Sequence, residues 1–316
     1  MFRTSGLLAA LIILSLVSLT VGVSSFSFVD LLAGNDLITQ ILIISRIPRL
    51  AAVILTGIGM SISGLIMQQL SRNRFVSPTT AGTADFARLG VLVSLLLIPH
   101  ASSLGKMVIV FAFAILGAFL FLSILQGMKM KDAIFVPLIG LMLGSVIDAV
   151  TTLIAYRFDL VQSISTWLMG NFAMVTQGRY ELLYMVIPLV VIAFFWADKF
   201  TIAGMGKDHA INLGLNYDLV MYVGLSIVSG ITAVVVASVG RIPFLGLIIP
   251  NIIALRKGDH LRSSFVSTGL FGAVFLLAAD IIGRVVIAPY EIPIGLTVGV
   301  TGSIVFLYLL LGRGKQ

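Results

Sequence analysis

The feature that most constrains the fold of this chain is a succession of long apolar runs separated by short polar segments. The runs occupy residues 6–26, 47–70, 87–99, 107–127, 133–156, 182–197, 218–239, 244–255, 264–288 and 293–311. A helix needs about 20 residues to cross the roughly 30 Å of hydrocarbon in a membrane, and most of the runs reach that length. The sequence therefore predicts an all-α polytopic membrane protein with about ten transmembrane helices.

Two of the runs, 87–99 and 244–255, are short for a regular span, and their boundaries are not defined by the sequence. Broken or shortened helices are tolerated at membrane depth only where protein or a water-filled cavity covers the backbone. We therefore expect both segments to lie against other helices or along a cavity.

The charged residues support a membrane assignment for the whole chain. Only 10% of the residues are charged, against about 25% in soluble domains. This deficit extends over the full length, which predicts one transmembrane domain over residues 1–316. The first run resembles a signal peptide, but it is long enough to span and further runs follow, so we expect an uncleaved first helix.

The net charge of +7 could indicate a nucleic-acid partner. The cations, however, lie in short segments between apolar runs, where they are typical of membrane orientation, so no nucleic acid is expected. The chain has no cysteine, which excludes disulfides, thiolate metal sites and cysteine nucleophiles.

The lysines predict the orientation. With both termini in the cytoplasm, six of the seven lysines fall in cytoplasmic segments and only Lys106 lies outside. The cytoplasmic cations are then Arg3, Arg72, Arg74, Lys129, Lys131, Lys199, Lys207, Arg256, Lys257, Arg262, Arg313 and Lys315. The outer segments contain Arg46, Arg49, Arg157, Arg179 and Arg284, with Asp30, Asp36, Asp159, Glu181 and Glu291. Arg46 and Arg49, on either side of Pro48, are exceptions to the charge rule that need a reason.

No arrangement typical of catalysis or metal binding is present in the sequence. There is no G-x-x-x-x-G-K-[ST] phosphate loop, and residues 312–315 have the wrong spacing for one. His100, His209 and His260 are scattered without metal-ligand spacing. We therefore expect no catalytic residue, metal site or cofactor, and no ATP hydrolysis by this chain alone.

Ionisable groups within spans are candidates for function. Asp148 and Asp280 lie inside long runs, and Asp85 and Arg88 begin a short one. One interpretation is a proton or cation relay, and the other is that each carboxylate caps a broken helix or bonds a neighbouring helix. The i, i+3 spacing of Asp85 and Arg88 also allows these two residues to neutralise each other on one helix face.

Three further stretches carry structural information. The small residues of 57–64 favour close helix packing. In 203–214, polar residues alternate with apolar ones up to Gly214, which predicts a short amphipathic helix that either docks onto a cytoplasmic partner or is merely solvated. In 240–251, Gly and Pro break an apolar run, which is typical either of a pathway lining or of a kinked packing helix.

Five motifs together resemble one family, the permease subunits of ABC importers for iron–siderophore, haem and vitamin B12. The family pattern R-L-P-R appears as Arg46-Ile-Pro-Arg49, and Q-x-x-x-R-N-x-x-x-S-P appears in residues 68–78 as QQLSRNRFVSP. The coupling-loop pattern G-E-x-x-A-x-x-L-G matches at Gly206, Ala210, Leu213 and Gly214, and G-x-I-x-F-x-G-L-x-x-P-H matches in residues 240–251. The pattern A-D-x-x-x-R…E-x-P-x-G matches at Ala279, Asp280, Arg284, Glu291, Pro293 and Gly295.

The sequence also departs from the family patterns. Lys207 stands where the family often has Glu, although Asp208 follows, and Asn251 replaces a frequent His. The stretch 79–90, TTAGTADFARLG, departs from the usual L-G-x-x-x-G-A and resembles instead the branch that imports catecholate siderophores such as petrobactin.

The resemblance implies the type II ABC importer permease fold, in which two permeases form a core and two ATP-binding subunits attach in the cytoplasm. ATP and Mg would be bound by those subunits. An extracytoplasmic substrate-binding protein would deliver an iron(III)–siderophore to the multi-pass permease in the lipid of a bacterial cytoplasmic membrane. The second permease is expected to be a sister chain, with a homodimer as the alternative. Haem or cobalamin remains an alternative substrate, and a proton-coupled secondary transporter is the alternative of another class.

The resemblance also implies residue roles. Docking of the binding protein would use Arg46, Arg49 and Arg284. Coupling to the ATPase would use Gly206, Asp208, Ala210, Leu213 and Gly214 in a cytoplasmic loop at about 198–217. The broken helix along the pathway would contain Gly240, Pro243, Gly246, Pro250 and Asn251. The fifth and tenth spans, 133–156 and 293–311, would line part of the pathway.

Overall fold

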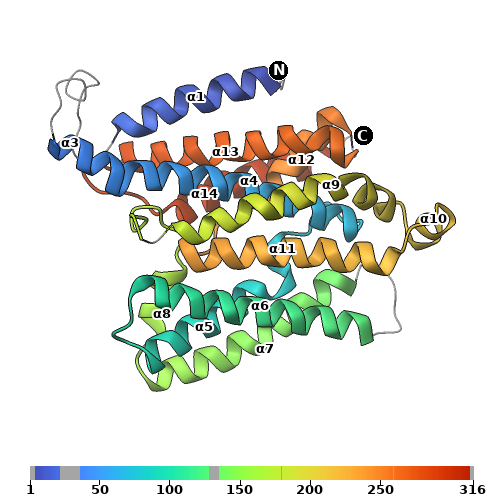
Figure 1. The fold of residues 1–316 in the computed structure, drawn as a ribbon, viewed down its shortest axis with the longest axis horizontal. Coiled ribbons are helices and arrows are strands. Elements are labelled where there is room, and N and C mark those ends of the chain that lie inside the picture. Colours follow the sequence, from blue (N-terminus) through green and yellow to red (C-terminus); the bar gives the residue numbers. More distant parts are fainter. Residues whose placement is uncertain (1–3, 22–35, 128–134, 179, 259, 314–316) are drawn as a thin grey trace.

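The computed structural model describes residues 4–21, 36–127, 135–178, 180–258 and 260–313 (Figure 1). Within these residues the chain is helical, apart from turns, connecting segments and an isolated bridge between Met169 and Arg241. Several cations of the predicted charge pattern, together with Asp30, lie outside the described residues. These cations are Arg3, Lys129, Lys131, Arg179 and Lys315.

Ten helices coincide with the ten predicted runs. They are α1 (Thr4–Thr20), α4 (Ile47–Leu70), α5 (Thr83–Leu97), α6 (Ser103–Gly127), α7 (Phe135–Arg157), α9 (Val186–Gly204), α11 (Tyr217–Val239), α12 (Leu245–Lys257), α13 (Leu261–Val285) and α14 (Ile294–Arg313). Shorter helices and turns connect them: α3 (Asp36–Ile41), α8 (Val161–Leu168), α10 (Lys207–Asn212), a π-helical turn (Leu42–Arg46) and 3-10 turns at Pro78–Ala81 and Glu181–Met185.

Six described helical segments are long and apolar enough to cross a membrane. They are Thr39–Leu70, Ser103–Ile124, Pro137–Arg157, Glu181–Gly204, Tyr217–Val239 and Leu261–Val285. Shorter apolar helices cover Thr4–Thr20 and Ile294–Leu307. The two short predicted runs form α5 and α12, and most residues of α12 are buried by neighbouring helices. The prediction of an all-helical membrane protein is confirmed.

Close packing of α4 against α13 forms the centre of the molecule, and Figure 1 shows these two helices side by side. A β-carbon added at Gly57 would lie 2.6 Å from the Cα of Ala273, and one at Gly272 would meet the carbonyl of Gly57 at 2.5 Å. Backbones approach this closely only where side chains are absent. The packing role predicted for residues 57–64 is confirmed.

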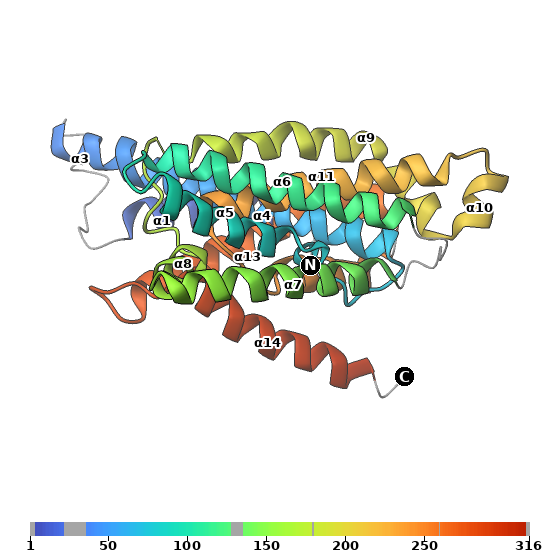
Figure 2. The same cartoon turned by 90° about the horizontal axis from the view of Figure 1, so that it is seen from below.

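The helices α5, α6, α7 and α8 form a second group below α11 in Figure 1. Figure 2 shows α9 on one side of the molecule and α14 on the opposite side. In both views α3 and α8 lie at one end of the molecule and α10 at the other. This arrangement separates the segments predicted to lie outside from the loop predicted to lie in the cytoplasm.

Candidate functional site

The predicted helix in the cytoplasmic loop is present as α10, and its two ends are set by glycines. Gly206 precedes the helix with a φ of +118°, and Gly214 follows it with a φ of +79°. The Gly214 amide donates to the carbonyl of Ile211 at 2.9 Å, and the Leu215 amide donates to that of Ala210 at 2.9 Å. This pair of bonds is a Schellman motif, which requires the left-handed conformation that glycine adopts without strain.

The helix α10 is anchored on one side and exposed on the other. Ala210 is completely buried, and Lys207 forms an ion pair with Asp218 at 3.1 Å. Met205 and Leu213 are 62% and 65% exposed, and Ile211 is also exposed. Asp208 lies exposed in the first turn. The predicted coupling residues therefore surround an apolar surface at one end of the molecule.

The predicted docking arginines lie close together at the other end, where α1, α4 and α13 meet. Arg49 donates from Nη2 to Asp280 and from Nη1 to Glu291, each at 2.8 Å. Asp280 is only 3% exposed and also forms an ion pair with Arg284 at 2.7 Å, in a geometry that is not aligned for a hydrogen bond. One buried carboxylate thus holds two guanidinium groups.

Two of these arginines also bind the end of α1. Arg284 donates to the carbonyls of Ser18 and Val21 at 2.9 and 3.0 Å, and Arg46 donates to the carbonyl of Leu19. Those carbonyls lie in the last turn of α1 or directly after it, where they have no intrahelical partner and where a cation is favoured. The arginines therefore connect three helices, and their guanidinium groups are largely buried.

The predicted broken helix is an interruption between α11 and α12. Gly240 has a φ of +90° at the end of α11, and Phe244 begins the next helix in the left-handed region. Pro250 lies inside α12, where it lines a cavity of about 180 Å³ together with Gln69 and Arg72. A β-carbon at Gly246 would lie 2.8 Å from the carbonyl of Met60.

Side-chain amides join this interruption to the 68–78 motif. Gln68 donates to the carbonyl of Leu247 at 3.1 Å. Asn251 donates to the carbonyl of Arg74 at 2.7 Å, so the residue that departs from the family's His closes the contact between the two motifs. Gly246 and Asn251 are buried packing residues, whereas Pro243 lines the larger cavity described next.

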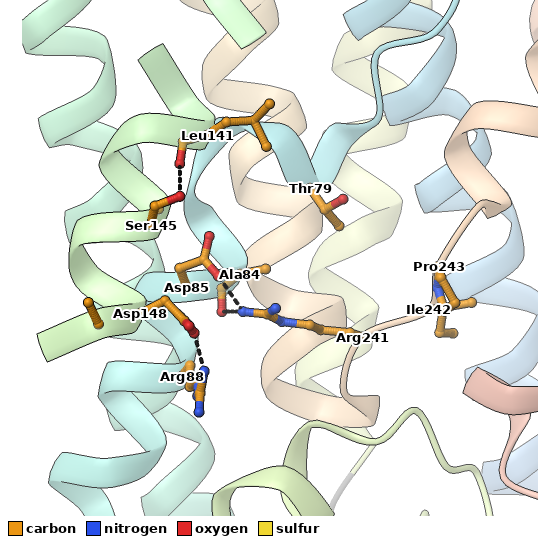
Figure 3. Close-up of a pocket in the computed structure, with 12 residues that line it drawn as sticks. Thr79, Ala84, Asp85, Arg88, Leu141, Ser145, Asp148, Arg241, Ile242 and Pro243 are labelled. Atoms are coloured by element: carbon orange, nitrogen blue, oxygen red, sulfur yellow. Dashed lines mark hydrogen bonds and ion pairs between the residues drawn. The ribbon is translucent and has the colours of Figure 1, made fainter. Parts of the chain in front are cut away.

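A cavity of about 630 Å³ lies between the start of α5, the middle of α7 and residues 241–243 (Figure 3). It is lined by Thr79, Ala84, Asp85, Arg88, Leu141, Gly144, Ser145, Asp148, Ala149, Arg241, Ile242 and Pro243. Asp85 accepts from Arg241 at 2.6 Å, and Arg88 donates to Asp148. Figure 3 shows Arg241 directed toward Asp85 and Ala84, with Arg88 beside Asp148.

The predicted pairing of Asp85 with Arg88 is wrong, because each residue pairs with a different element. Asp85 turns to Arg241 beyond α11, and Arg88 turns to Asp148 on α7. Glycine permits the approach of α5 to α7, since a β-carbon at Gly144 would collide with the Asp85 carboxylate. The alternative that each carboxylate bonds a neighbouring segment fits Asp85, Asp148 and Asp280.

Sequence reasoning did not single out Arg241 or Ser18. Arg241 had a visible signal, a lone cation between two apolar runs in residues 240–251. Ser18 had none, because a serine near the end of an apolar helix is common. Among the described residues, no group of three or more His, Cys, Asp or Glu could hold a metal ion.

Comparison with known proteins places the chain in one family. The sequence profile of the FecCD transport family matches residues 7–312. The petrobactin import system permease protein YclN of Bacillus subtilis is 55% identical over 303 residues, covering 96% of each chain. The ferric-anguibactin transport system permease protein FatD of Vibrio anguillarum is 42% identical over 87% of each chain.

The fold has a close match among solved structures. An inward-facing structure of a metal-chelate type ABC transporter has a TM-score of 0.86, with 24% identity, and the match covers 97% of this chain and 98% of that one. This similarity concerns the fold alone. Together with the profile match over nearly the whole length, it leads to one conclusion: the chain is a multi-pass membrane permease that belongs to the FecCD transport family.

Proposed function

We propose that this chain is the transmembrane permease subunit of an ATP-driven importer for an iron(III)–siderophore with catecholate ligands. The observation that carries the proposal is the 55% identity over 96% of both chains to a petrobactin import permease. A second petrobactin import permease, from Bacillus anthracis, is 38% identical over 96% of this chain. Import into the cytoplasm across a bacterial cytoplasmic membrane follows from the same relatives.

In this proposal α10 receives the movement of the ATP-binding subunits. Its exposed apolar residues, Met205, Ile211 and Leu213, would fill a groove on the ATPase, because an apolar surface of this kind gains free energy only when a partner covers it. Gly206 and Gly214 hold the ends of α10 in conformations that other residues adopt only with strain. Asp208 would supply negative charge in the first turn of α10. The buried Ala210 would anchor the same helix to the rest of the protein.

The opposite end would receive the substrate-binding protein. Charged partners steer association and set register more than they add affinity, and the planar guanidinium group matches a carboxylate with two hydrogen bonds. Arg46, Arg49 and Arg284 would supply the positive charge in this docking. Arg49 contacts Asp280 and Glu291, and Arg284 contacts Asp280, so an incoming acidic side chain would compete with these carboxylates for the two guanidinium groups.

The pathway would run along α7 and α14, whose faces are exposed in the single chain and would be covered by a second permease. Exposed apolar residues on α7 include Leu141, Met142, Val146 and Leu153, and those on α14 include Val300 and Ile304. We expect the second permease to be a sister chain rather than a second copy.

The substrate is tested by uptake into vesicles. The chain is reconstituted with candidate ATPase subunits, a sister permease and the binding protein, and is offered radioactive ferric catecholate siderophores, ferric hydroxamates, haem and cobalamin. We expect ATP-dependent accumulation of a ferric catecholate well above the other compounds. Accumulation of haem or cobalamin instead would support the alternative substrates and contradict the siderophore assignment.

A further inference from the structure

The cavity between α5, α7 and residues 241–243 contains more charge than a membrane interior normally tolerates. Two arginines and two aspartates line it, and one of them, Asp148, lies near the middle of α7, a helix long and apolar enough to cross a membrane. Ionisable groups at such positions are costly and usually serve a pathway. The four side chains are therefore candidates for contact with whatever passes along α7.

The arginines have hydrogen-bonding capacity that the protein does not use. Within the described part of the chain, Arg88 donates only from Nη1, to Asp148. Arg241 donates from Nη2 to Asp85 and to the carbonyl of Ala84, and its Nε is buried with no partner there. A guanidinium group has five N–H donors, so both arginines retain donors at the cavity wall.

The cavity has the size and accessibility of a ligand site. Its volume of about 630 Å³ lies within the range of roughly 300–1,000 Å³ for small-molecule pockets. Leu141, Ser145 and Ala149 of its lining are exposed, so the cavity reaches the surface of α7. The side chains of Asp148 and Arg241 are 41% and 37% exposed, which makes both reachable from that surface.

We propose that Arg88 and Arg241 form a recognition site for the anionic oxygens of the transported chelate, and that Asp148 and Asp85 occupy these arginines when the site is empty. Guanidinium groups bind oxygen anions through short, charge-assisted hydrogen bonds. The ligand is an oxygen-rich, negatively charged metal chelate. The carboxylates keep the empty cavity neutral. When the anion binds, its oxygens replace the carboxylates as hydrogen-bond partners of the two guanidinium groups. This inference rests on the proposed function for the nature of the chelate.

The test measures binding directly, without transport. The full chain in lipid nanodiscs is titrated by equilibrium dialysis with a strongly anionic ferric tris-catecholate and with an uncharged ferric tris-hydroxamate of similar size. We expect the unchanged chain to bind the anionic complex at least about tenfold more tightly, because one charge-assisted hydrogen bond has about that effect. Equal affinity for the two complexes would overturn the proposal.

Variants with opposite expected effects separate recognition from structural support. Arg88→Gln and Arg241→Gln should each weaken binding of the anionic complex about tenfold. Asp148→Asn should tighten it, because the competing carboxylate is lost. Arg157→Gln, at the exposed end of α7, is the control and should bind like the unchanged chain. A purely structural ion pair would give the same loss for Asp148→Asn as for Arg88→Gln, and that result would refute the site.

The double variant Arg88→Gln with Asp148→Asn leaves no unpaired charge, because both members of the ion pair become neutral. It should bind the hydroxamate normally, and its preference for the anionic complex should fall about tenfold, because only Arg241 remains at the site. Retention of the full preference would count against the proposal. Anion-selective binding in a chain that supports no ATP-driven uptake would contradict the proposed function while supporting this site.

Discussion

Asp280 illustrates at the scale of single residues how a buried charge is maintained inside a membrane protein. Its carboxylate is 3% exposed and contacts the guanidinium groups of both Arg49 and Arg284. A buried ion pair adds little stability compared with apolar residues, but the loss of one partner leaves an uncompensated charge. Arg49, one of the two arginines outside the membrane charge rule, therefore has an internal reason for its position, in addition to any role in docking.

The first prediction concerns the loss of this carboxylate. Asp280→Asn should lower the free energy of unfolding by about 3–5 kcal/mol, because two buried cations lose their shared anion. Thermal unfolding in detergent measures the effect. The control is Asp198→Asn, which breaks an exposed pair with Arg262 and should cost at most about 1 kcal/mol. Equal losses of stability in the two variants would mean that the ion pairs of Asp280 with Arg49 and Arg284 do not stabilise the fold.

The same residues separate docking from stability. Arg49→Gln removes a cation that the binding protein is proposed to use, whereas Asp280→Asn leaves every cation in place. Association of the binding protein, followed by surface plasmon resonance, should slow in Arg49→Gln and persist in Asp280→Asn. Unchanged association in both folded variants would remove Arg49 from the docking surface.

At the scale of single residues, the sequence indicated which charges matter but not which partners they choose. Asp85 and Arg88 have the spacing of a helical pair, yet each bonds a residue more than 50 positions away in the chain. Helix spacing describes only neighbours on the same helix, and the tertiary approach of α5 to α7 decided the pairing. The docking and coupling assignments came from motif matches, which identify positions without their geometry.

At the scale of helices, contact between glycines allows the interrupted α11–α12 segment to enter the centre of the fold. A β-carbon at Gly64 of α4 would collide with the backbone of Gly246 at the start of α12. The periodicity of apolar residues predicted that these helices exist, and the small residues of 57–64 predicted close packing. The identity of the partner could not be predicted, because a glycine-rich face fits any close neighbour.

The second prediction tests that contact. Gly64→Ala should destabilise the protein by about 1–3 kcal/mol or more, since a backbone carbonyl cannot move aside as a flexible side chain can. The unfolding temperature in detergent measures this. Gly6→Ala in α1, where a β-carbon meets nothing within 4 Å, is the matched control and should be neutral or slightly stabilising. A neutral Gly64→Ala would contradict the packing described for α4 and α12.

The third prediction concerns α10 as a coupling element. Gly214→Val should strain the Schellman motif and displace the exposed face of α10, so that ATP hydrolysis continues while uptake per ATP falls severalfold. Gly178→Val imposes comparable strain, at a φ of +87°, with nothing within 4 Å and far from α10, and serves as the control. The ratio of uptake to hydrolysis is measured in vesicles. A normal ratio in Gly214→Val would mean that α10 is a solvated turn.

At the scale of the whole molecule, the sequence correctly predicted the helical membrane fold and the helix that each apolar run forms. The reason is that the bilayer imposes length and apolarity on each span independently of its neighbours. The prediction was weaker at the ends of the runs. The run 87–99 became a helix from Thr83, because Gly82, with a φ of +73°, lets the chain turn into the helix earlier.

The fourth prediction tests the orientation, with both termini in the cytoplasm. The natural chain has no cysteine, so single replacements report their own position. His100→Cys, in the exposed turn between α5 and α6, should react with a membrane-impermeant maleimide added to whole cells. His209→Cys in α10 and His260→Cys before α13 should react only after the membrane is opened. The reverse pattern would invert the topology and place α10 out of reach of any cytoplasmic ATPase.

The energy source of uptake tests the central claim most directly. Vesicles containing this chain, a candidate sister permease, candidate ATPase subunits and internal ATP are given a candidate binding protein loaded with a radioactive ferric catecholate. The predicted result is accumulation that stops when the ATPase is inactivated and that persists when a protonophore collapses the proton gradient. Accumulation without the ATPase, abolished by the protonophore, would contradict the account and identify the chain as a proton-coupled transporter.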